Sequence, residues 1–171
     1  MPNWCEGNIR FRGKCKDIKR FLMNEIVVCS YERKGDMCET VERKPEIDDK
    51  GYELIITKPD HAWFYIKTTH RNFFETDVLE IWLYDDEEEK EKETVICVDN
   101  FRAAWSFDKC DAWKDFAKEY NMDVRMVGFE KGMEFSQIKT IYRDGKVKDE
   151  IKEYTDWEDW MWNATLPNNG G

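Results

Sequence analysis

The chain of 171 residues is 41% hydrophobic and 15% aromatic, which is enough to bury the core of one domain and excludes wholesale disorder. It contains no apolar run of the roughly 18 residues that a membrane-spanning helix needs, and its first residues are of mixed polarity, unlike a signal peptide. We therefore expect a cytoplasmic protein without a membrane partner. The formal charge of −10 is unevenly placed, because residues 85–93 carry seven acids against two lysines and residues 149–160 carry six acids against one lysine.

The first predicted element is a strand within residues 3–13, where apolar and polar side chains alternate before a glycine. Residues 14–25 follow as an amphipathic helix, because their apolar positions recur at spacings of three and four. The polar stretch 30–50 then carries no repeating pattern. Residues 48–51 (Asp-Asp-Lys-Gly) predict a turn at its end.

Short β-rich runs come next, at residues 52–57, 62–68, 78–84 and 94–99. The acidic run 85–93 lies between the last two of them, so we place it at the tip of an inserted hairpin. A second helix is expected over residues 108–120, and a strand over 122–129. Beyond it, Asp144-Gly145 is a strong signal for a two-residue hairpin turn.

This order of elements predicts an α+β fold. We expect a split β-α-β sandwich, in which an antiparallel sheet carries both helices on one face and extra β-hairpins extend the sheet. Residues 1–150 would form this domain. Residues 151–171 would form an acidic, tryptophan-rich C-terminal extension that can cover the open face of the sheet.

Two blocks of the sequence are similar to a known family. They are MPNWCEGNIRFRG followed by KDIKRFL, and DNFRAAWSFDKCDAWKDFAKEYNMDVRMVGFEKGMEFSQ. The chain resembles the YubB-like ferredoxin-fold family of small phage- and plasmid-borne proteins, and the matching positions are Pro2, Asn3, Trp4, Cys5, Trp105, Ser106, Glu130, Gly132 and Phe135. The resemblance implies a ferredoxin-like sheet and an origin on a mobile element. The family is mostly of unknown function, so it implies no catalytic residues.

Motifs for catalysis or metal binding are missing from the sequence. No glycine-rich nucleotide motif occurs, and no Cys-His or Ser-His arrangement can be singled out. The six cysteines, at positions 5, 15, 29, 38, 97 and 110, are dispersed, so we expect free thiols and no metal site. Trp4, Cys5, Trp105 and Phe135 are interpreted as core residues. The sequence thus predicts a protein that is not an enzyme and takes neither a cofactor nor a small-molecule substrate.

The two acidic stretches are the candidate partner-binding site. A concentrated negative field selects basic partners, and the second stretch interleaves its carboxylates with tryptophans, as protein-binding surfaces do. Small phage proteins with these traits are often inhibitors of host defence. We therefore expect an anti-CRISPR-like inhibitor that binds a CRISPR effector nuclease and competes with its nucleic acid. The candidate residues are Asp85, Asp86, Glu87, Glu88, Glu89, Glu153, Asp156, Trp157, Glu158, Asp159 and Trp160.

The charged segments can also have purely structural roles. The acids can be a solvated loop and a tail whose tryptophans fold back on the core. A second functional hypothesis is a nucleic-acid-binding accessory protein that uses its sheet and the basic patch from Arg10 to Arg20. That patch can equally be the solvated back of the first helix, and a sequence pI near 4.8 opposes binding to a polyanion.

Overall fold

The computed structural model describes residues 3–34, 37–69, 72–83, 90–107, 111–154, 156, 158–159 and 162. Within them, twelve strands form two antiparallel sheets, accompanied by the short helices α1 (Cys15–Glu25) and α3 (Ala112–Glu119). In spatial order, the large sheet consists of β12 (Val147–Glu153), β11 (Phe135–Ile141), β10 (Asp123–Glu130), β1 (Trp4–Lys14), β9 (Glu93–Ala104), β7 (Asn72–Phe74), β6 (Ala62–Ile66), β2 (Ile26–Lys34) and β3 (Met37–Arg43). The small sheet consists of β4 (Glu46–Asp49), β5 (Glu53–Thr57) and β8 (Val78–Trp82).

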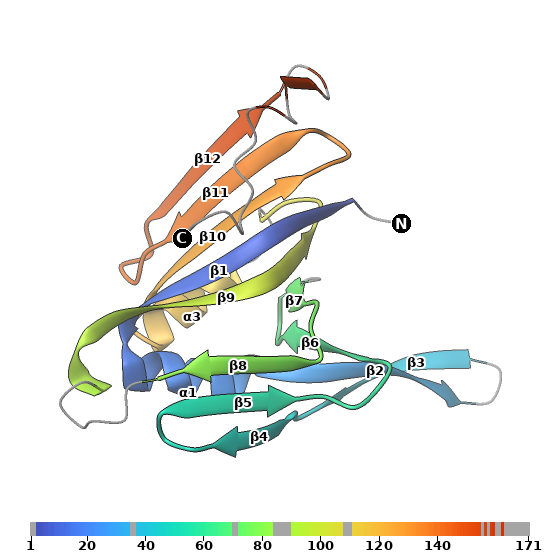
Figure 1. Cartoon of the computed structure of the whole chain (residues 1–171), viewed down its shortest axis with the longest axis vertical. Helices are drawn as coiled ribbons and strands as arrows, with labels where there is room; N and C mark the ends of the chain where they lie inside the picture. Colours follow the sequence, from blue (N-terminus) through green and yellow to red (C-terminus); the bar gives the residue numbers. More distant parts are fainter. Residues whose placement is uncertain are drawn as a thin grey trace.

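The large sheet is strongly twisted. In Figure 1, β12, β11, β10, β1 and β9 run side by side as one layer, while β2 and β3 lie at an angle to it and are joined to it through β7 and β6. The small sheet packs on the same core as the helices, because Leu54 of β5 and Ile81 of β8 belong to one buried cluster with Ile26 of β2. None of the described helices or strands packs on the opposite face of the large sheet, which we call the open face.

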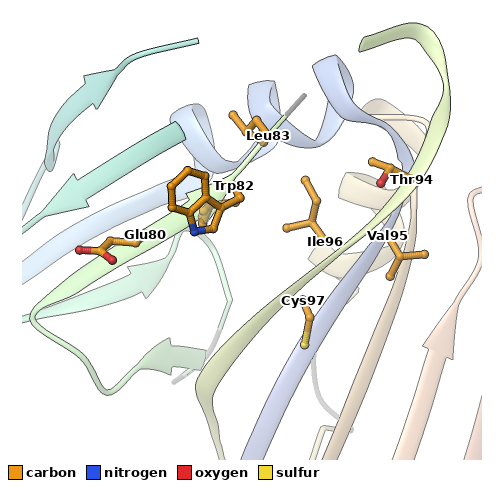
Figure 2. Close-up of a pocket in the computed structure, with 8 residues that line it drawn as sticks. Glu80, Trp82, Leu83, Thr94, Val95, Ile96 and Cys97 are labelled. Carbon is orange, nitrogen blue, oxygen red and sulfur yellow. The ribbon is translucent and has the colours of Figure 1, made fainter. Parts of the chain in front are cut away.

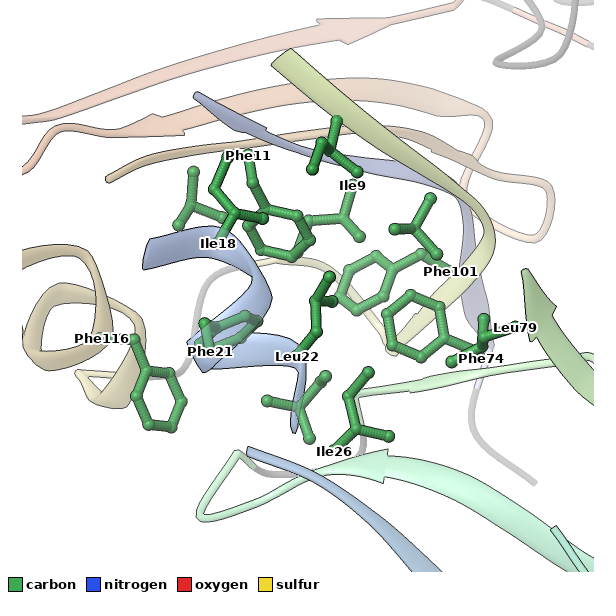
Figure 3. Packing of buried hydrophobic residues seen from close by; sticks show 14 of the residues in the cluster. Ile9, Phe11, Ile18, Phe21, Leu22, Ile26, Phe74, Leu79, Phe101 and Phe116 are labelled. Atoms are coloured by element: carbon green, nitrogen blue, oxygen red, sulfur yellow. The ribbon is translucent and has the colours of Figure 1, made fainter. Parts of the chain in front are cut away.

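Both helices pack on one face of the large sheet around Phe21. Figure 3 shows Phe11 of β1 and Phe21 of α1 among the buried hydrophobic side chains, and the centroids of these two rings lie 5.0 Å apart. Burial of one phenylalanine side chain stabilises a fold by about 1.5–3 kcal/mol. On the side facing α3, Phe21 contacts the rings of Trp113, Phe116 and Tyr120.

The predicted ferredoxin-like split β-α-β sandwich is wrong, because the protein is mostly antiparallel β structure with only two short helices among the described elements. The largest error falls on residues 30–50, which form the end of β2, all of β3 and β4 instead of an unpatterned stretch. Their side chains are mostly exposed, so no alternation marks them as strands. Cross-strand pairing makes them strands: β2 and β3 stay in register from Val28 opposite Arg43 to Lys34 opposite Met37.

Several local predictions are confirmed. Strand β1 pairs antiparallel with β10, and α1 begins directly after β1, as its apolar spacing indicated. The Asp144-Gly145 turn joins β11 and β12 into a hairpin, with Gly145 at φ +88°, a conformation that glycine adopts without strain. Among the described residues, none of the helices has the length and apolar content to cross a membrane.

Candidate partner-binding surface

The first acidic stretch is joined to strands of two different sheets. Its candidate residues Asp85, Asp86, Glu87, Glu88 and Glu89 lie outside the described residues. The strands on either side do not form the expected hairpin, because β8 pairs with β5 in the small sheet whereas β9 pairs with β1 and β7 in the large sheet. The stretch therefore connects a strand of the small sheet to a strand of the large sheet.

A shallow cavity of about 320 Å³ lies beside the ends of this connection, between β8 and β9. Figure 2 shows Trp82 on one side and Val95 and Cys97 on the other. Desolvation raises the pKa of the Cys97 thiol, and nearby Asp99 raises it further, so the thiol stays protonated at neutral pH. A protonated thiol is a poor nucleophile, and the cavity offers no activated group for covalent chemistry.

The second acidic stretch begins on β12, an edge strand of the large sheet whose residues are all exposed. Asp149 is held in place, since its carboxylate accepts hydrogen bonds from Gln137 Nε2 at 2.9 Å and Lys139 Nζ at 3.1 Å. None of the described strands pairs with the other edge of β12, and an edge of this kind readily accepts a further strand or a partner.

Tyr154 anchors the segment that follows β12. Its backbone N–H donates to the Glu134 carbonyl at 3.0 Å, and its hydroxyl lies 2.8 Å from Ser136 Oγ. The ring packs with Phe129, and Lys152 Nζ lies 4.7 Å above its centroid. These contacts hold Tyr154 against β10 and β11 at the end of β12.

Carboxylates around this anchor have no basic partner within the part of the chain that the structure describes: no lysine or arginine there forms an ion pair with Glu153, Asp156 or Glu158. Asp156 Oδ1 accepts the Asp159 backbone N–H, at 2.8 Å. Glu153 lines a cavity of about 470 Å³ together with Trp105, whose side chain is 57% exposed, and with Met133, Phe135 and Ile151. The two other candidates, Trp157 and Trp160, lie outside the described residues.

The prediction that Trp105 is a core residue is wrong, because its side chain is exposed. Its φ of +73° places it in the left-handed region, and its backbone N–H donates to the Asn3 carbonyl at 2.8 Å. This backbone conformation directs the indole away from the core at the end of β9. Cys5 is buried as expected, whereas Trp4 and Phe135 are partly exposed.

The basic patch from Arg10 to Arg20 is largely neutralised by the protein's own carboxylates. Lys14 and Lys16 both pair with Glu91, and this contact lowers the Glu91 pKa. Lys19 Nζ lies 2.6 Å from Asp49 Oδ1. In addition, Arg12 pairs with Asp123 at 2.7 Å, and the Arg20 guanidinium lies 5.0 Å from the Tyr120 ring centroid. Phosphate binding by this patch would have to compete with these contacts.

Sequence reasoning missed a second surface, the aromatic side chains on the open face of the large sheet. The signal was present in residues 62–66 (AWFYI), where Ala62, Phe64 and Ile66 are buried while Trp63 and Tyr65 point to the other face. That alternation places two large rings on a face that the core does not use. The other aromatic side chains of this surface come from β1, β2 and β7. These strands are far apart in the sequence, so the sequence alone does not show that their side chains meet.

Within the described residues, no cluster of three or more metal-ligating side chains is present, and Cys5, Cys15, Cys29 and Cys97 are free thiols. The side chains of Cys38 and Cys110 lie outside the described set. Comparisons with protein-family models, curated proteins and solved structures found no match to this chain.

Proposed function

We propose that the protein is a non-enzymatic inhibitor that binds a basic nucleic-acid-binding protein through its C-terminal acidic surface. The proposed partner is a CRISPR effector nuclease, whose nucleic-acid channel is lined by basic side chains. The inhibitor would be encoded by a phage or another mobile element and would act in the cytoplasm of the host bacterium.

One observation supports this proposal: the basic patch is paired internally, whereas Glu153, Asp156 and Glu158 have no basic partner among the residues that the structure describes. Unpaired exposed carboxylates can accept a partner's arginines without breaking contacts within the protein. A phosphate on the basic patch would instead displace existing pairs, such as that of Arg12 with the nearly buried Asp123. Charge-assisted hydrogen bonds from arginine to carboxylate are strong and directional, which suits competition with phosphate.

The test compares two triple variants with the same change in net charge. Glu153→Gln, Asp156→Asn and Glu158→Gln neutralise the proposed surface. The control neutralises three other exposed acids that form no ion pair with a described residue, by Glu46→Gln, Asp60→Asn and Asp115→Asn. Both variants should keep the wild-type fold, because exposed charges contribute roughly 0–1 kcal/mol each.

Inhibition of target-DNA cleavage is measured with a panel of guide-loaded CRISPR effector nucleases. We expect the wild type and the control to inhibit at least one effector, with inhibition that weakens as salt rises, and the surface variant to lose most of it. Equal inhibition by the two triple variants would contradict the proposed site, and failure of the wild type against every effector would contradict the proposed partner.

Nucleic-acid binding is the second candidate function, and the exposed rings on the open face favour it, because sheets with such rings stack RNA bases. Under this hypothesis, Arg10→Ala, Arg12→Ala and Lys16→Ala together should abolish binding to single-stranded DNA or RNA, measured by fluorescence anisotropy. Unchanged binding in this triple variant, or an absence of binding by the wild type, would remove the patch from consideration.

A further inference from the structure

A groove lined by aromatic side chains lies on the open face of the large sheet, opposite the core. Its volume is about 720 Å³, and its lining comes from β1, β7, β6, β2 and β3. In Figure 1, the N-terminal end of β1 and the β2–β3 hairpin lie on either side of β6 and β7. Two edge-to-face ring pairs build it: Trp4 with Phe73, at a centroid distance of 4.9 Å, and Tyr31 with Trp63, at 5.3 Å.

The rings of this groove are exposed far more than core packing would allow. Tyr31 is 66% exposed and Trp63 is 42% exposed, although both are large and apolar. Contiguous exposed aromatic surface of this kind marks a binding site more often than isolated apolar residues do. Because the rings come from separate strands of a rigid sheet, the groove is formed before any ligand arrives.

Among the described residues that line the groove, Glu42 is the one acidic or basic side chain. The strand register places it: Cys29 lies opposite Trp63 on one side and opposite Glu42 on the other. Strands are about 4.8 Å apart, so the backbones of Trp63 and Glu42 are separated by about 10 Å. Glu42 and Cys29 both line the groove. Desolvation raises the pKa of the Cys29 thiol, and the negative charge of Glu42 raises it further.

We propose that this groove binds an arginine side chain of a peptide segment in a partner protein. The guanidinium would stack on Trp63 and Tyr31 and donate hydrogen bonds to Glu42. A stacking distance of about 3.5–4 Å and a charge-assisted hydrogen bond of about 2.8 Å fit within the separation set by the two strand spacings. Arginine satisfies both halves of the site at once, because it is planar and always charged.

The charges near the groove favour a cation over a nucleotide. The nearest arginine on its β9 side, Arg102, already pairs with Glu6 at 3.2 Å and with Glu75. Arg33 shares the open face of β2 but lies beyond Tyr31, and it too has an interaction within the protein. A phosphate backbone would therefore meet Glu42 and two occupied arginines, and the net charge of −10 would oppose its approach.

The arginine would belong to the same basic partner as in the proposed function. The inference rests on the proposed function for the identity of this partner, and not for the binding of arginine in the groove. The groove and the acidic surface are on different strands: Trp63 and Glu42 lie on β6 and β3, toward one end of the large sheet, and Glu153 lies on β12 at the other end. A peptide assay on the groove can therefore succeed while nuclease inhibition fails, or the reverse.

The test follows the indole N–H resonances of the full chain by NMR during titration with a nine-residue Gly-Ser peptide that carries one central arginine. Resonances are assigned with Trp63→Phe, Trp4→Phe and Trp82→Phe. The comparison peptide carries citrulline, which keeps the shape of arginine but not its charge. Variant Glu42→Gln removes the carboxylate's charge, and Glu46→Gln is the matched control on neighbouring β4.

We expect the Trp63 resonance to titrate with the arginine peptide, while that of Trp82 on the small sheet does not. The citrulline peptide should bind about tenfold more weakly, Glu42→Gln should weaken arginine binding about fivefold or more, and Glu46→Gln and the C-terminal triple variant should match the wild type. Equal binding of both peptides, or an unshifted Trp63 resonance up to the solubility limit, would overturn the proposal. Preferential binding of oligouridine at Trp63 would overturn it in favour of RNA.

Discussion

The sharpest structural prediction concerns Asp123, which ties the end of β1 to the segment after β11. Its Oδ2 accepts hydrogen bonds from Arg12 Nε at 2.9 Å and Nη2 at 2.7 Å, and its Oδ1 accepts the Arg143 backbone N–H at 2.9 Å and Nε at 3.2 Å. The Asp123 side chain is 10% exposed. Burial alone would raise its pKa, but the hydrogen bonds from Arg143 and Arg12 outweigh burial and lower the pKa below its ordinary value.

The substitution Asp123→Asn keeps the shape of the side chain and removes its charge. Hydrogen bonds to a charged group contribute about 1.5–3 kcal/mol, but Arg12 is largely exposed and its share is screened by solvent. Asparagine can still accept the Arg143 backbone N–H. We therefore expect a loss of about 2 kcal/mol in the free energy of unfolding, or a fall in Tm of about 4–8 °C for a chain of this size.

Urea unfolding followed by tryptophan fluorescence measures this loss, with the exposed Asp60→Asn as control. A carboxyl group whose pKa is lowered by folding stabilises the protein above its unfolded pKa of about 3.9, and this contribution disappears as pH falls through the folded pKa. The difference between wild type and Asp123→Asn should therefore shrink as pH falls from 7 to about 2. A difference below about 0.5 kcal/mol at pH 7, or one that stays constant with pH, would refute the assigned role of Asp123.

Two further predictions concern the core. A Cβ added by Gly7→Ala would collide with the backbone oxygen of Val127, so we expect this substitution to lower the free energy of unfolding in urea by about 1–3 kcal/mol or more. Gly145 has open space around it, and Gly145→Ala should lower the same quantity by about 1 kcal/mol. Equal losses would contradict the close approach of β1 and β10. Desolvation and the hydrogen bond to Glu25 raise the pKa of Tyr120 to about 12, so an alkaline absorbance titration should show one tyrosine ionising late, and Tyr120→Phe should remove that step. A titration in which the late step persists in Tyr120→Phe would refute the assignment.

The sequence predicted the elements that have a local signature, such as a single buried face or a glycine at a turn. The alternation in β1, the stripe of α1 and the glycine of the β11–β12 turn each reflect a local physical requirement, so each could be found without the structure. Strands β3 and β4 could not, because their side chains are mostly exposed and their pairing partners alone define them. The error in fold class follows from these missing strands.

The candidate site was predicted in part. Clustering of acids in residues 149–160 is a property of the sequence. Whether a described lysine or arginine lies near Glu153 or Glu158 depends on the fold, and none does. Lys14 and Lys16 pair with Glu91, which is more than 70 positions away in the sequence. Because the sequence does not show this contact, residues 10–20 were interpreted as a basic patch, whereas the structure shows ion pairs there. The aromatic groove likewise needs five strands to be assembled before its rings meet.

Displacement of DNA tests the central claim most directly. Fluorescence anisotropy of labelled target DNA is followed on guide-loaded, cleavage-inactive CRISPR effectors as the protein is added. We expect the wild type and the control triple variant (Glu46→Gln, Asp60→Asn, Asp115→Asn) to release the DNA from at least one effector, and the variant with Glu153→Gln, Asp156→Asn and Glu158→Gln to leave the DNA bound. Release of DNA by the acid-neutralised variant at wild-type concentrations, or retention of DNA by every effector in the presence of the wild type, would contradict it.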